Sequence, residues 1–142
     1  MIFFNYENNY SLNNEDVYQS WIESVIHGES YNIGEISYIF CDDDYLLDIN
    51  IKHLNHDTYT DIITFNYCEN DLISGDIFIS TERVEENAQT FQVSFHEELL
   101  RVMSHGVLHL MGYNDKTDEE EEIMRKKEDE KIKMFHVKHS QR

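Results

Sequence analysis

The residues best suited to chemistry lie in one short segment, HGVLHLMGYND at positions 105–115. His105 and His109 are four residues apart, so on a helix their side chains share one face, about a turn apart. Two imidazole nitrogens in that arrangement can bind one metal ion. Gly112 can end the helix with a positive φ, and the turn after it can bring Asp115 back toward the histidines. We therefore predict a metal site with His105, His109 and Asp115 as ligands.

Three protein ligands leave a fourth position on the ion for water. A bound metal lowers the pKa of that water toward about 7 and makes hydroxide available near neutral pH. Two helix histidines alone could also belong to a half-buried face, but the glycine and aspartate at fixed spacing favour a metal site. The site indicates a metal-dependent hydrolase. The sequence assigns no general base, so the catalytic residues beyond the ligands are unknown.

The elements that must position this segment follow a pattern of strands early in the chain and helices late. Strands are expected at 2–6, 35–41, 60–67 and 75–80, and helices at 14–26, 42–51, from 81 onward, 94–111 and 117–134. The pairs Ser94/Glu97 and Thr117/Glu120 have the spacing of capping boxes. This order predicts an α+β fold with a small mixed β-sheet packed with helices, in a single domain over residues 1–142. Residues 135–142 are expected to form a loose tail.

The charge distribution restricts the possible partners. The net charge is −18, and residues 116–142 hold eight acidic and eight basic residues, so residues 1–115 carry all of it with 21 acidic and three basic residues. Such an acidic body repels phosphate backbones unless a metal or a basic patch offsets it. Six basic residues lie between positions 125 and 138. If a nucleic acid is the partner, we hypothesise that Lys127 and Lys131, on one helix face, attract it, or that a basic protein bound to the acidic body delivers it. The alternative is that these lysines only balance the neighbouring glutamates on a solvated helix face.

Other features of the sequence concern the cellular compartment. No apolar run of about 18 residues is present, so no membrane partner is expected. The first residues, MIFFNYENNY, lack the basic region of a signal peptide. Cys41 and Cys68 are not in a CxxC pair, and two free thiols are the preferred interpretation over one disulfide. We expect a cytoplasmic protein.

The segment HGVLHLMGYND resembles the signature HGxLHLxGYDH of the YbeY family of bacterial endoribonucleases. DDDYLLDIN at 42–50 resembles the acidic helix start of that family, TDIITF at 60–65 its TDVLSF strand, and GDIFIS at 75–80 its GDI strand. The resemblance covers about residues 35–130. It implies a zincin-like α+β fold and one Zn²⁺ ion per chain, although another divalent metal is possible.

The resemblance also implies a function and partners. It implies a single-strand-specific endoribonuclease that acts in ribosomal RNA maturation, at the 3′ end of 16S rRNA, and in ribosome quality control. The expected partners are ribosomal RNA and, in addition, ribosomal proteins, with no DNA.

Two positions depart from the family pattern. Asp115 stands where the family usually has a third histidine, which makes the site one charge less positive and shifts its preference toward harder ions. Leu54 stands where the family usually carries an arginine before its TDVLSF strand. Lys52, His53 and His56 are alternatives that could replace this arginine, and the sequence does not choose between them.

Two other functions fit parts of the pattern. A metzincin-like metallopeptidase shares the ligand spacing of HExxHxxGxxH, but it needs a glutamate after the first histidine, where this chain has Gly106. Glycine cannot accept a proton, which disfavours peptide hydrolysis by that route. The third alternative is a non-catalytic, ribosome-associated module with a structural metal, consistent with the acidic body and Leu54.

Overall fold

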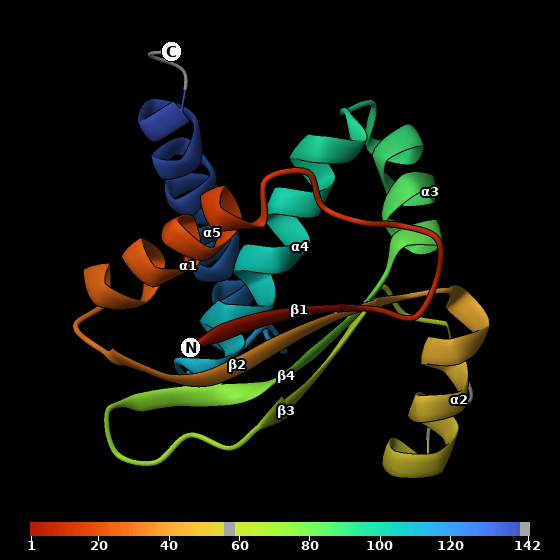
Figure 1. Ribbon diagram of the computed structural model, residues 1–142, viewed down its shortest axis with the longest axis horizontal. Coiled ribbons are helices and arrows are strands. Elements are labelled where there is room, and N and C mark those ends of the chain that lie inside the picture. Colours follow the sequence, from red (N-terminus) through yellow and green to blue (C-terminus); the bar gives the residue numbers. More distant parts are fainter. Residues whose placement is uncertain (56–58, 140–142) are drawn as a thin grey trace.

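The protein contains a four-stranded mixed sheet with most of its helices on one face (Figure 1). The computed structural model describes residues 1–55 and 59–139. The strands are β1 (Ile2–Tyr6), β2 (Asn32–Cys41), β3 (Ile62–Asn66) and β4 (Leu72–Ser80). Their order in the sheet is β1-β2-β4-β3, with β1, β2 and β4 parallel and β3 antiparallel to β4.

One face of the sheet carries the main core. Ile36, Tyr38 and Phe40 alternate along β2, and Ile77 and Ile79 alternate along β4, and all five are fully buried. Successive side chains of a strand point to opposite faces, so these residues lie on the same side of the sheet. Helices cover that side, which explains why the two strands are so strongly apolar.

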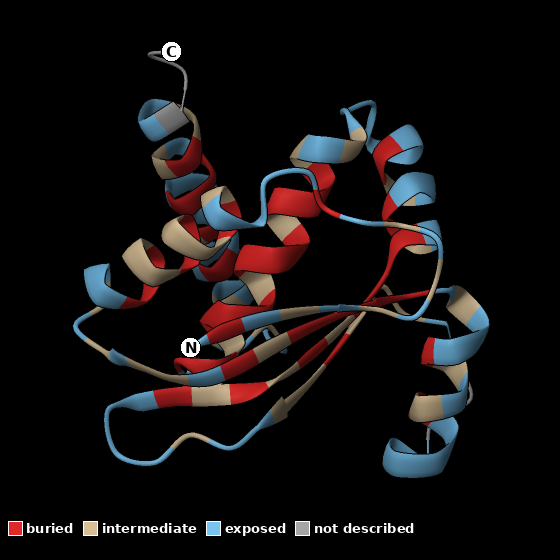
Figure 2. Cartoon of the chain, in the orientation of Figure 1, coloured by how far each residue is buried: buried red, intermediate tan, exposed pale blue. Residues whose placement is uncertain are grey.

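Five helices occur in the described parts of the chain. They are α1 (Glu15–Gly28), α2 (Asp43–Leu54), α3 (Thr81–Phe91), α4 (Phe95–Leu110) and α5 (Asp118–His139). Helix α4 lies on the sheet against β3 and β4, and it also contacts α1, α3 and α5. Figure 2 shows buried residues along much of α4, as expected for the central helix of this layer. The helix that carries both histidines is thus the most firmly enclosed.

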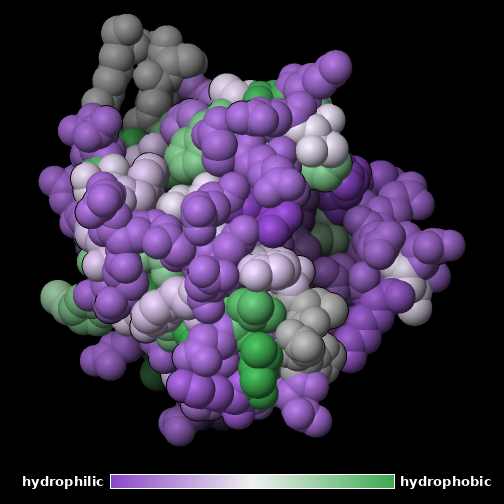
Figure 3. All heavy atoms as spheres, turned by 90° about the vertical axis from the view of Figure 1, so that its right-hand side faces the viewer, coloured by the Kyte–Doolittle hydropathy of each residue, from purple (hydrophilic) through white to green (hydrophobic). Residues whose placement is uncertain are grey.

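Helix α2 is the exception, because it packs against β3 and β4 on the opposite face. A small second cluster of Cys41, Leu46 and Ile63 fills this contact. The side of the molecule that carries α2 and α3 is mostly hydrophilic, with a narrow hydrophobic strip and smaller, scattered hydrophobic areas (Figure 3). No described helix is long and apolar enough to cross a membrane.

The expected α+β class with a small mixed sheet is confirmed. The loose tail predicted for 135–142 is wrong for residues 135–139, because α5 continues through His139. Phe135 is buried, and its ring lies 5.4 Å from that of Trp21 in α1. This apolar anchor extends the helix beyond Met134. Residues 140–142 lie outside the described part of the chain.

Candidate metal centre

Helix α4 places His105 and His109 one turn apart. The helix begins after Ser94, whose hydroxyl oxygen accepts a hydrogen bond from the backbone N–H of Glu97 at 3.0 Å, as the predicted cap requires. The two imidazole rings are neighbours, with centroids 4.5 Å apart. The spacing read from the sequence therefore puts both rings on one helix face.

A tight turn brings Asp115 to the histidines. The backbone N–H of Gly112 donates to the carbonyl of His109 at 3.0 Å, and Gly112 has a φ of 99°. This region of φ suits glycine because it has no Cβ. The hydroxyl of Tyr113 donates to Glu29 at the end of α1 over 2.5 Å, which fixes the turn from outside. Asp115 follows directly from this anchored segment.

The three predicted ligands form one cluster. Oδ2 of Asp115 lies 3.2 Å from Nε2 of His105 and 3.3 Å from Nε2 of His109. One ligand atom from each residue lies within 4.8 Å of the other two. Ligands at about 2.0–2.1 Å from a tetrahedral zinc ion are roughly 3.3 Å apart. The donor set and its spacing fit a zinc-sized ion.

The cavity beside the cluster is strongly acidic. It measures ≈ 490 Å³ and is lined by His105, Asp115, Asp118, Glu121, Glu122, Met124, Arg125 and Glu128. Five carboxylates and one guanidinium face it, so the local field favours cations. The same field opposes an RNA phosphate, and Arg125 is the one guanidinium among these lining residues, with His105 as the other basic side chain.

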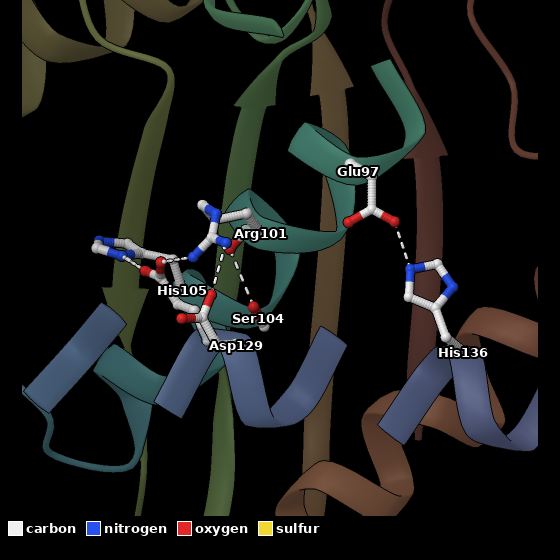
Figure 4. Close-up of polar contacts among 7 residues, drawn as sticks. Glu97, Arg101, Ser104, His105, Asp129 and His136 are labelled. Carbon is white, nitrogen blue, oxygen red and sulfur yellow. Dashed lines mark hydrogen bonds and ion pairs between the residues drawn. The ribbon is translucent and has the colours of Figure 1, made fainter. Parts of the chain in front are cut away.

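His105 has a second carboxylate partner. Its Nδ1 lies 2.5 Å from Oε2 of Glu128 in α5, and Oε1 of the same carboxylate accepts from Arg101 at 2.9 Å. Arg101 and His105 lie side by side on α4 and face α5 (Figure 4). Burial lowers the pKa of His105, but the hydrogen bond to Glu128 and the charges of Glu128, Asp115 and Asp61 outweigh it, so the pKa is raised. The field around His105 thus favours positive charge.

Gly106 is fixed by packing rather than by backbone conformation. A Cβ atom at this position would lie 2.8 Å from Cγ2 of Ile77 and 2.9 Å from Cδ1 of Ile62. Gly106, the residue after the first histidine, therefore packs so closely against Ile77 and Ile62 that a side chain does not fit there. A metzincin-type glutamate has no room here, which argues against the peptidase mechanism.

The sequence did not reveal which residues of α5 are buried and support the metal centre. Glu128 and Lys131 are 5% and 1% exposed, although the sequence pattern suggested a solvated helix. The hypothesis that Lys127 and Lys131 bind RNA is not supported, because both ammonium groups contact Glu29, at 3.1 and 2.8 Å. The available signal was helical spacing: Glu128 and Lys131 fall on the buried stripe of α5 with Met124 and other apolar residues.

The position of the family arginine remains without a basic replacement among the described candidates. Leu54 ends α2 and is exposed. Lys52 pairs with Asp48 on the surface at 3.0 Å, and the ring of His53 packs edge-on against Phe65. Neither contact connects them to the metal cluster. His56 lies outside the described residues.

Comparison with known proteins identifies the family of this chain. A family model described as Endoribonuclease YbeY matches residues 3–136. The chain belongs to the YbeY family. It is 61% identical to Endoribonuclease YbeY of Flavobacterium johnsoniae, over 96% of this chain and 99% of that protein. It is 46% identical to Endoribonuclease YbeY of Cytophaga hutchinsonii, over 94% of each.

The fold agrees with membership of the YbeY family. The solution structure of TM1509 from Thermotoga maritima superposes with a TM-score of 0.69 at 27% identity, covering 97% of this chain and 91% of that one. The family resemblance identified from HGVLHLMGYND is therefore confirmed over nearly the whole chain.

Proposed function

We propose that this protein is a metal-dependent endoribonuclease whose single metal ion is bound by His105, His109 and Asp115. The observation that carries the proposal is the convergence of these three ligand atoms within 4.8 Å in a chain that belongs to the YbeY family. We further propose zinc as the ion, at one per chain. A bound divalent ion would polarise a phosphoryl oxygen or lower the pKa of a water molecule.

The residues of the chain have separate roles in this proposal. Nε2 of each histidine and Oδ2 of Asp115 point into the cluster and hold the ion. Gly112 and Tyr113 set the turn that presents Asp115. Arg125, which lines the same cavity, is positioned to receive an RNA phosphate beside the ion. Its single charge reduces the repulsion that the acidic cavity would otherwise exert on RNA.

We propose single-stranded ribosomal RNA, including the 3′ end of 16S rRNA, as the substrate, and cytoplasmic ribosome maturation and quality control as the setting. Relatives that align over nearly their full length are named Endoribonuclease YbeY, which supports RNA as the substrate class. A basic ribosomal protein is a suitable partner, since residues 1–115 carry the whole net charge of −18.

The test is cleavage of RNA by purified protein loaded with one equivalent of Zn²⁺. The substrate is a 16S rRNA fragment with a single-stranded 3′ extension, and casein serves as the peptidase substrate. We expect cleavage in the single strand, loss of cleavage with chelator, and none of casein. The matched control is His109→Ala at the same zinc concentration. Cleavage by that variant at the parent rate would contradict the proposal.

A non-catalytic, ribosome-associated metal-binding module is the second candidate. The cavity beside the metal cluster favours this second function, because its five carboxylates and one arginine offer little positive charge to bind phosphate. This function predicts zinc binding and ribosome association without cleavage of any RNA. The assay above separates the two candidates directly.

A further inference from the structure

Metal-binding histidines depend on the group that holds their second ring nitrogen. In a neutral imidazole one nitrogen carries the proton and the other is free to bind a metal. A carboxylate on the protonated nitrogen fixes this arrangement, orients the ring and makes the other nitrogen a stronger ligand.

We propose that Glu128 is the positioning residue of the metal centre and that it acts through His105. The inference rests on the proposed metal site. Oε2 of Glu128 lies 2.5 Å from Nδ1 of His105, while Nε2 of the same ring faces Asp115 at 3.2 Å. The Glu128 contact therefore places the ring proton on Nδ1 and leaves the Nε2 lone pair directed at the ion.

Glu128 is itself rigidly held. Its side chain is 7% exposed, and its other oxygen, Oε1, accepts from Arg101 at 2.9 Å. Arg101 is four residues before His105, so the two share one face of α4 and a single carboxylate of α5 bridges them. Arg101 also donates to Asp129 at 2.7 Å (Figure 4). Arg101 is therefore fixed by two carboxylates of α5, and its hydrogen bond to Oε1 of Glu128 leaves that carboxylate little freedom to rotate away from His105.

Helix α5 thereby becomes part of the metal site without supplying a ligand. The indole N–H of Trp21 donates to the backbone carbonyl of Lys131 at 2.8 Å, and Met124 and Ile132 are buried on either side of Glu128. These contacts hold α5 against the other helices and so fix the position of Glu128 relative to His105. The geometry points to a site whose affinity depends on the docking of α5.

The experiment compares zinc affinity in three proteins by competition with a chromophoric chelator. Glu128→Gln should bind Zn²⁺ about 10–100-fold more weakly than the parent. Glu121→Gln is the matched control, since it removes a carboxylate from the same cavity that contacts no ligand. Its affinity should change by less than about fivefold, because an exposed charge in water contributes about 1 kcal/mol or less. Equal affinities of the two variants would overturn the inference.

A second measurement needs no substitution and covers the case in which Glu128→Gln fails to fold. Proton–nitrogen correlation spectra of the histidine rings in the zinc-loaded parent should show His105 protonated at Nδ1 and metal-bound at Nε2. Coordination through Nδ1 would overturn the role of Glu128. A parent that binds no zinc would contradict the proposed function as well, whereas a zinc-binding parent with an unaffected Glu128→Gln variant would remove only the inference.

Discussion

The Nζ atom of Lys131 lies 2.8 Å from Oε2 of Glu29, in a buried contact between α5 and the end of α1. Lys127 contacts the same oxygen at 3.1 Å, and Tyr113 donates to the other one. Burial raises the pKa of Glu29, but the hydrogen bonds from Lys131, Tyr113 and Lys127 outweigh it and lower the pKa to about 2. One carboxylate thus joins α1, α5 and the turn that carries Asp115.

The Glu29 contact should make stability depend on pH. Its pKa is lowered in the folded state from a usual 4.5 to about 2, so its contribution is complete above pH 4.5 and is lost as the pH falls toward 2. At pH 7, Glu29→Gln should lower the free energy of unfolding by about 3 kcal/mol, because it removes the closest ion-pair partner of the buried Lys131 and leaves only the exposed Glu130, at 3.7 Å.

Urea denaturation at pH 7 and pH 3 measures this effect. The difference between parent and Glu29→Gln should shrink at the lower pH. Glu122→Gln is the control, since it removes only an exposed pair with Lys126 and should cost no more than about 0.5 kcal/mol. A difference between Glu29→Gln and parent that is the same at both pH values would refute the role of this carboxylate.

Asp115→His should retain one zinc ion per chain. The substitution supplies the ligand that the HGxLHLxGYDH signature has at this position, and the anchored turn remains. Asp115→Ala should bind at least about tenfold more weakly, since it removes a ligand. Zinc content after gel filtration is the measurement, with Asp118→Ala, from the same cavity, as the control. Complete loss of zinc from Asp115→His would show that Asp115 is not a ligand.

Gly112→Val should weaken zinc binding without altering a ligand. The φ of 99° at this position is unfavourable for residues with a Cβ and costs about 1–3 kcal/mol, most for β-branched ones. A Cβ atom here meets nothing within 4 Å, so any loss arises from the backbone and not from a clash. Gly112→Asn should therefore lose less affinity than Gly112→Val in the chelator competition. Equal losses would rule out the conformational explanation.

RNA binding should depend on Arg125 rather than on Lys127 or Lys131. Arg125→Gln should weaken binding of single-stranded RNA and reduce the slope of log K against log salt by about 1, as expected for one lost phosphate contact. Lys126→Gln removes the adjacent exposed charge, which does not line the cavity, and is the matched control. If both variants reduce the slope equally, general electrostatics and not a defined contact accounts for the attraction.

The clustering of His105, His109 and Asp115 could be predicted from the sequence because the three proposed ligands lie in one segment of eleven residues. Helical periodicity and the conformational freedom of glycine fix their relative positions locally. The capping box of α5 is equally local: Glu120 N–H donates to Oγ1 of Thr117, and Thr117 N–H donates to the Glu120 carboxylate, both at 3.1 Å. Short-range rules were sufficient for these features.

The supporting contacts could not be predicted, because they join segments far apart in the chain. Glu29 and Lys131 are 102 residues apart, and His105 and Glu128 are 23 residues apart. A charged residue within a helix normally indicates a solvated face, and only the partner from another helix explains its burial. The order of strands in the sheet likewise depends on long-range pairing that local patterns do not encode.

The most direct test of the central claim is the zinc content of the parent protein and of His109→Ala, purified without chelator and measured by mass spectrometry of the metal. We predict one zinc per chain in the parent and none in the variant, with both proteins folded by circular dichroism. Retention of one zinc per chain by folded His109→Ala would contradict the proposal that His105, His109 and Asp115 form the metal centre.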